Sequence, residues 1–162
     1  MLFVLFLFAA LGCAVVGGIF FAFSTFVMKA LARLPAGEGI AAMQSINIVV
    51  INPWFMPAFL GTAVLCVLAL ICSVLRWRDP GAAWLLTGSV LYLAGSLWVT
   101  MAFNVPWNNR LAAVARSDLD GAKLWADYVA SWTAWNHVRT AASLAAAALF
   151  SIALGFRGLA PA

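Results

Sequence analysis

Long uncharged stretches alternate with short charged connections along the chain. No Asp, Glu, Lys or Arg occurs in four of these stretches, residues 1–28, 39–75, 81–109 and 140–156. A membrane-spanning helix needs roughly 20 mostly apolar residues. The pattern therefore predicts an antiparallel bundle of four spanning helices with both termini on one side. We expect these helices near residues 2–28, 54–75, 81–105 and 135–156.

Two further segments are predicted to be helical and to lie at the membrane interface. In the first, residues 37–51, Gln44 and Asn47 share one face, and Asn52-Pro53 ends the helix. The second, residues 118–135, has Ser117 as a candidate N-cap. It should continue directly into the fourth spanning helix. The predicted fold class is an all-α, antiparallel four-helix transmembrane bundle with additional interfacial helical segments, forming a single domain over residues 1–162.

Two local patterns bear on how these helices pack. Pro106 cannot donate a hydrogen bond to the carbonyl of Ala102, so the third helix should kink there. The first helix carries small residues at every fourth position, which predicts a seam for close packing against another helix. These residues are Ala10, Ala14, Gly18 and Ala22.

Composition supports a membrane protein and excludes a soluble domain. Charged residues make up 9% of the chain and hydrophobic residues 66%, whereas charged residues average about 25% in soluble domains. We therefore expect a multi-pass protein of the cell membrane with the lipid bilayer as its surroundings. The net charge of +4 does not suggest nucleic acid, because the basic residues are scattered through the connections. Their distribution slightly favours a cytoplasmic location for the end that holds Lys29, Arg33 and Arg110.

Polar residues gather toward that same end of the predicted bundle. Asn104 and Asn108 are four apart on one helix, and Asn136 and Arg139 are three apart on another. Such groups are costly in lipid unless they are paired, so they should face one another or a polar ligand. This predicts a pocket at one end of the bundle. The alternative is that the amides only tie helices together while Arg139 reaches toward lipid headgroups.

Aromatic and further polar residues surround these positions. Trp107, Trp132 and Trp135 alternate with the amides and could hold a flat aromatic ligand. His137 is the only histidine; at a helix entrance it is more often a surface residue, but it is the available candidate for a general base. The remaining candidates for substrate binding are Tyr128, Asn47 and Asn52.

The sequence gives little support for metal chemistry. Cys13, Cys66 and Cys72 are dispersed in the predicted helices and are better explained as small apolar filler than as a disulfide or metal site. With one histidine and no carboxylate in a spanning stretch, no three-residue ligand set can be assembled. Glycine-rich nucleotide loops and nucleophile elbows are also missing.

Three motifs carry a resemblance to a known family. They are Gly-Gly-x-Phe-Phe-Ala-Phe-Ser at residues 17–24, Asn-x-Pro-x-Asn-x-x-Leu at 104–111, and Trp-x-x-Tyr-x-x-x-Trp-x-x-Trp-Asn-x-x-Arg at 125–139. Together they resemble the anthrone oxygenase-like family of small four-helix membrane proteins, over nearly the whole chain. The resemblance implies a cofactor-independent monooxygenase that inserts oxygen into an anthrone to give an anthraquinone, without metal or flavin.

Under that interpretation, Arg139 and the amides Asn104, Asn108 and Asn136 would stabilise negative charge developing on a lipophilic aromatic substrate of the anthrone or phenol type. Its rings would lie against the tryptophans, and dioxygen would be the second reactant. A different class of function stays open, namely a non-enzymatic membrane protein that binds a quinone or other lipophile, or an accessory or structural subunit. The sequence also leaves open a homo-oligomer.

Overall fold

The computed structural model describes residues 2–114 and 121–158, and all regular structure within these ranges is helical. Four helices are long and apolar enough to cross a membrane, Leu2–Leu31, Phe55–Leu75, Ala82–Ala112 and Gly121–Phe156. The predicted all-α class with four spanning helices is confirmed. The chain is a multi-pass integral membrane protein.

Two of these long helices, the first and the third, combine α-helical and π-helical segments. The first comprises α1 (Leu2–Ala22), the π-helix η1 (Phe23–Val27) and α2 (Met28–Leu31), and the second is α4 (Phe55–Leu75). The third comprises α5 (Ala82–Val90), the π-helices η2 (Leu91–Trp98) and η3 (Thr100–Asn104), and α6 (Val105–Ala112). The fourth is α7 (Gly121–Gly158). In the sequence, the short α3 (Ala36–Val49) lies between the first and second long helices.

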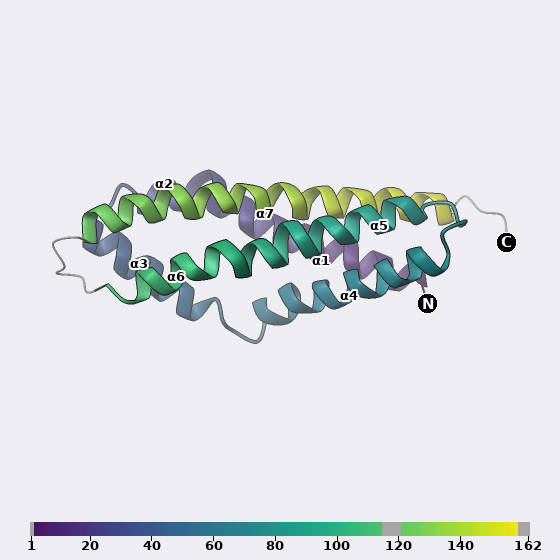
Figure 1. Ribbon diagram of the computed structural model, residues 1–162, viewed down its shortest axis with the longest axis horizontal. Coiled ribbons are helices and arrows are strands. Elements are labelled where there is room, and N and C mark those ends of the chain that lie inside the picture. The colour runs from purple at the N-terminus through teal and green to yellow at the C-terminus, as the bar shows by residue number, and fades with distance from the viewer. Residues whose placement is uncertain (1, 115–120, 159–162) are drawn as a thin grey trace.

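Successive long helices run in opposite directions, so both ends of the chain lie at one end of an elongated bundle (Figure 1). α1 packs on α7 and α4, α4 packs on α5, and α5 and η2 pack back on α7. At the opposite end, α3 packs against α6 and α7. α3 therefore covers the end of the bundle that lies far from the termini.

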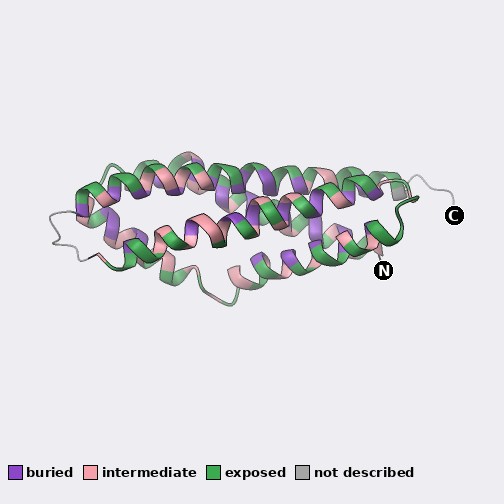
Figure 2. Ribbon diagram, in the orientation of Figure 1, coloured by how far each residue is buried: buried purple, intermediate pink, exposed green. Residues whose placement is uncertain are grey.

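Each long helix buries one side and exposes the other (Figure 2). The exposed sides carry large apolar residues, for example Phe8, Val64 and Trp98. Such a surface would be an aggregation hazard in water, but it is what hydrocarbon surroundings require.

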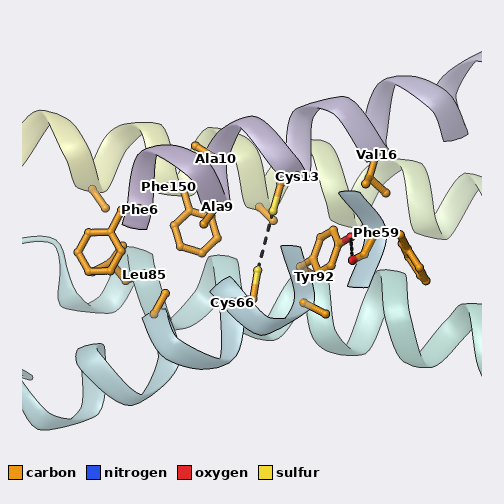
Figure 3. Close-up of a cluster of buried hydrophobic side chains, with 14 of the residues drawn as sticks. Phe6, Ala9, Ala10, Cys13, Val16, Phe59, Cys66, Leu85, Tyr92 and Phe150 are labelled. Carbon is orange, nitrogen blue, oxygen red and sulfur yellow. Dashed lines mark hydrogen bonds between the residues drawn. The ribbon is translucent and has the colours of Figure 1, made fainter. Parts of the chain in front are cut away.

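A cluster of buried apolar side chains from α1, α4, α5, η2 and α7 forms one core of the bundle (Figure 3). Phe6 and Phe150 are fully buried there, and the Tyr92 hydroxyl donates to the carbonyl of Phe59 at 2.9 Å. Cys13 and Cys66 are free thiols whose Sγ atoms lie 4.0 Å apart across α1 and α4. Their position among apolar side chains agrees with the role of small filler expected from the sequence.

Some boundaries differ from the sequence prediction. The third long helix ends at Ala112 rather than near 105, and Pro106 lies at the start of α6, immediately after the π-helix η3. The change of hydrogen-bond pattern in η3 falls where the proline withholds its donor. The segment before the fourth helix does continue into it, as one 38-residue helix. The proposed N-cap Ser117 lies outside the described residues.

Only part of the seam predicted on the first helix packs within this chain, since Ala10 is buried in the core. Ala14 and Gly18 are exposed, and a side chain added at Gly18 would meet nothing. The close approach is made by Gly12, where a Cβ atom would collide with Thr62 of α4. The spacing of small residues identified the right helix, but Ala14 and Gly18 lie on its exposed face and Gly12 on the face toward α4.

Candidate functional site

The guanidinium of Arg139 is buried inside the bundle, near the middle of α7. Arg139 of α7 is only 4% exposed. Its Cζ atom lies 4.2 Å from the ring centroid of Phe20 and 4.9 Å from that of Trp132. Both distances are within the range of a cation–π interaction, which is strongest when the cation is desolvated. Aromatic faces thus replace much of the water that this cation has lost.

Arg139 is held by neutral hydrogen-bond acceptors. Its Nη2 donates to Oδ1 of Asn136 at 2.6 Å, and its Nη1 donates to Oγ1 of Thr100 at 3.2 Å. Nε is buried without a hydrogen-bond partner. Among the described residues no carboxylate pairs with the guanidinium, so its charge is balanced only by dipoles and rings.

Asn136 anchors the arginine to the first helix. Its Nδ2 donates to the carbonyl of Phe20 and to Oγ of Ser24, both at 2.7 Å. Ser24 Oγ lies 3.0 Å from Oγ1 of Thr140, which donates to the carbonyl of Asn136 at 2.8 Å. The amide therefore has partners on both its oxygen and its nitrogen, and the guanidinium is fixed in orientation.

Unpartnered polar atoms gather around Trp132. Asn104 of η3 donates from Nδ2 to the carbonyl of Trp132 at 3.1 Å, while its Oδ1 has no partner. The indole Nε1 of Trp132 is also buried without a partner, as is Nε of Arg139. Buried polar groups are nearly always hydrogen-bonded in folded proteins. Asn104 thus keeps one unpaired acceptor, and Trp132 and Arg139 each keep one unpaired donor; these three atoms are the hydrogen-bonding groups still free in this part of the bundle among the described residues.

A second polar group lies next to this one, toward α3. Tyr128 stacks between Trp125, with ring centroids 5.7 Å apart, and Trp132, at 6.1 Å. Its hydroxyl donates to Oδ1 of Asn108 at 2.8 Å, and Asn47 of α3 also interacts with it. Tyr128 lies close enough to Arg139 for an electrostatic interaction. A continuous line of aromatic faces thus connects the covered end of the bundle to the guanidinium.

Three of the residues expected at the site make their described contacts with residues other than Arg139. Asn52 forms the turn before α4, accepting from the backbone N–H groups of Trp54 and Phe55 at 2.9 Å. Trp135 stacks on Phe103 of η3, with centroids 3.6 Å apart. His137 is exposed and lines an external groove.

Trp107 belongs to the second polar group, beside Tyr128. It meets Tyr128 edge to face at 6.4 Å, and Arg110 lies 5.0 Å above its ring. Of the residues expected at the site, the structure brings Asn104, Asn136 and Trp132 against or next to Arg139, and Trp107, Asn108 and Asn47 against Tyr128.

π-helical backbone supplies some of the residues in and around this site. Ser24 lies in η1, and Thr100 and Asn104 lie in η3. π-helical segments within longer helices occur frequently at functional sites. Sequence reasoning missed Phe20, Ser24, Thr100 and Thr140. Ser24 closes the motif at residues 17–24, and Thr100 lies four residues before Asn104, so both had a signal in the sequence.

The fold and this site define a multi-pass helical membrane protein with a buried guanidinium held by amides, hydroxyls and aromatic faces. A family model described as anthrone oxygenase matches residues 48–149. That range covers more than half of the chain, and the protein belongs to the anthrone oxygenase family. Neither the comparison with curated proteins nor that with solved structures found a significant match.

Proposed function

We propose that the protein oxygenates a lipophilic aromatic substrate of the anthrone or phenol type, using dioxygen and binding the substrate as its anion beside Arg139. One observation carries the proposal: Arg139 is a buried cation with no carboxylate partner among the described residues. A buried charge that lacks an opposite charge is strongly unfavourable. An anionic substrate would supply that opposite charge, and membership of the anthrone oxygenase family supports the choice of an anthrone-type molecule.

In the proposed reaction the substrate itself reduces dioxygen. An anthrone loses a proton from its methylene carbon to give an electron-rich enolate, with the negative charge shared by the carbonyl oxygen. The enolate carbon reduces dioxygen and bonds to it, giving a hydroperoxide after protonation. Loss of one water molecule from the hydroperoxide leaves a second carbonyl group. One oxygen atom of dioxygen is retained in the anthraquinone and the other leaves as water, with the substrate as the only reductant.

The side chains at the site have defined roles in this scheme. Arg139 binds the enolate oxygen, and its guanidinium can present two parallel N–H donors to it. Fixed donors in surroundings without bulk water stabilise an anion more strongly than water-exposed ones. The indole N–H of Trp132 is a further donor, and its ring with that of Tyr128 provides flat faces for the substrate. Asn136 is a positioning residue that orients Arg139.

A second candidate function is binding of a quinone or other lipophile without turnover. The observation that favours it is the position of His137, which is exposed and lines the external groove. The described residues around Arg139 include no carboxylate or imidazole that would accept the substrate's proton. Under the oxygenase proposal this proton passes to water at the membrane boundary, as Arg139 draws the substrate into its ionised form.

Oxygenation by the purified protein separates the two functions. The full chain, purified in detergent and treated to remove metals and flavin, is given a hydroxylated anthrone in buffer equilibrated with ¹⁸O₂. We expect quinone formation well above spontaneous oxidation, one dioxygen consumed per quinone and one ¹⁸O atom retained. The Arg139→Ala variant provides the matched background. Binding of the quinone with oxidation no faster than in that variant would replace the oxygenase proposal with the binding function.

A further inference from the structure

A groove on the outside of the bundle runs between the first helix and α7. It has a volume of about 430 Å³, which lies in the range of small-molecule sites. Its α7 wall includes the small residues Ala130 and Ala134, and Lys29 and His137 contribute its polar groups. None of the described residues that line it is acidic. The groove therefore combines room for a flat molecule with positive charge.

The groove adjoins the buried site. Ser24 lines the groove and accepts a hydrogen bond from Asn136, which in turn accepts one from Arg139. Thr133 also lines it, and its Oγ1 is buried with no hydrogen-bond partner among the described residues. The groove wall is thus two hydrogen bonds away from the guanidinium, with an unused hydroxyl beside the path.

The depth of the groove suits an amphiphile. At 1.5 Å per residue, Ser24 lies about 33 Å along the helix from Leu2, whereas the hydrocarbon core is about 30 Å thick. Lys29 is exposed one turn further on. The groove thus opens at the membrane boundary on the side away from the termini, where a weakly acidic aromatic molecule would place its ionised group in the interface and its rings in lipid.

We infer that this groove is the lateral access route and outer binding site for a weakly acidic aromatic amphiphile on its way to Arg139. The inference rests on the proposed function for the identity of the ligand. Lys29 attracts the anion, and Ala130 and Ala134 leave room for its rings, while the buried hydroxyl of Thr133 lies behind this wall. Displacement of Ser24 within η1 then opens the path to the buried guanidinium.

Photolabelling of the full chain in lipid nanodiscs tests the route independently of turnover. The probe is a hydroxyanthraquinone that carries a diazirine, and labelled peptides are mapped by mass spectrometry. We expect label in residues 24–33 and 129–137. Ala134→Trp, which fills the groove, should reduce this labelling at least tenfold. Ala145→Trp is the matched control, because Ala145 is exposed on the same helix outside the groove, and it should leave labelling unchanged.

Charge is tested in the same assay. Lys29→Glu should reduce labelling severalfold, Lys29→Arg should preserve it, and an O-methylated probe that cannot ionise should label weakly. Equal labelling by the O-methylated probe, or displacement of the acidic probe by anionic phospholipid at ordinary membrane content, would make the groove a lipid site and overturn the inference. So would a lack of label in both segments.

The two proposals fail separately. Label in the groove without oxygenation of an anthrone would retain the access route and overturn the proposed function. Oxygenation that Ala134→Trp leaves unchanged, with no label in the groove, would retain the function and overturn the route.

Discussion

Nη2 of Arg139 donates to Oδ1 of Asn136 at 2.6 Å, between residues three positions apart on α7. The opposite end of the same amide donates to Phe20 and Ser24 on the first helix. The amide therefore orients the guanidinium and ties α7 to α1 and η1, without supplying a negative charge. This combination leaves the cation fixed and still available to an anion.

Replacing Arg139 by lysine should abolish most activity while the protein still inserts and folds. A lysine ammonium is a point charge and cannot reproduce two parallel donors or stack flat on Phe20 and Trp132. We expect kcat/KM for anthrone oxidation to fall by about 10²-fold to 10³-fold, typical of losing a donor that stabilises an oxyanion. Arg33→Lys is the control, because Arg33 is exposed, and its kinetics should match the wild type. Full activity in Arg139→Lys would reduce this residue to an anchor.

The hydrogen bond between Tyr128 and Asn108 should contribute to stability. Tyr128→Phe removes the donor and keeps the stack on Trp125 and Trp132, so unfolding should become easier by about 1 kcal/mol. A double-mutant cycle with Asn108→Ala, measured by unfolding in mixed detergent, should give a coupling energy of about 0.5–1.5 kcal/mol. Strictly additive effects would show that the two side chains do not interact in the membrane.

Two glycines on α1 provide a matched test of the packing. A methyl group at Gly12 would collide with Thr62, whereas one at Gly18 would meet open space. Gly12→Ala should therefore destabilise the protein by about 1–3 kcal/mol through overpacking. Gly18→Ala should be neutral or slightly stabilising, because alanine has the higher helix propensity. Thermal unfolding in detergent compares them, and equal melting temperatures would contradict the α1–α4 contact.

Much of the fold could be predicted from sequence because lipid imposes simple rules on it. Spanning helices need long stretches free of charge, and residues 2–28 and 55–75 satisfy this without ambiguity. A kink at Pro106 could be predicted, but not the end of the helix at Ala112 or the π-helix η3 that precedes the proline. The cytoplasmic location of the site end stays a prediction.

The site could be predicted in part, because buried polar groups must find partners and α7 repeats every 3.6 residues. Trp132 and Arg139 are seven residues apart and lie on one face of α7. At 100° per residue, Asn136 lies about 40° around the helix from Trp132. His137 lies about 140° away from Trp132, which explains why it faces outward. The neighbours of Trp135 depended on where η3 passes, and nothing in the sequence of α7 specifies that.

We propose above that Arg139 binds an anionic ligand. Introducing a carboxylate next to its guanidinium by mutation is the most direct test. Thr100 Oγ1 accepts from Arg139 at 3.2 Å, so Thr100→Asp places a negative charge against the guanidinium, while Thr100→Val removes only a neutral hydroxyl. We predict that Thr100→Asp folds with stability within about 1 kcal/mol of the wild type, since the new pair offsets its own desolvation. Its kcat/KM should fall by about 10²-fold, against a change of less than about threefold in Thr100→Val, which loses one ordinary hydrogen bond. Thr100→Asp protein that is folded and oxidises the anthrone at the wild-type rate would contradict the account, because its Arg139 would already be neutralised.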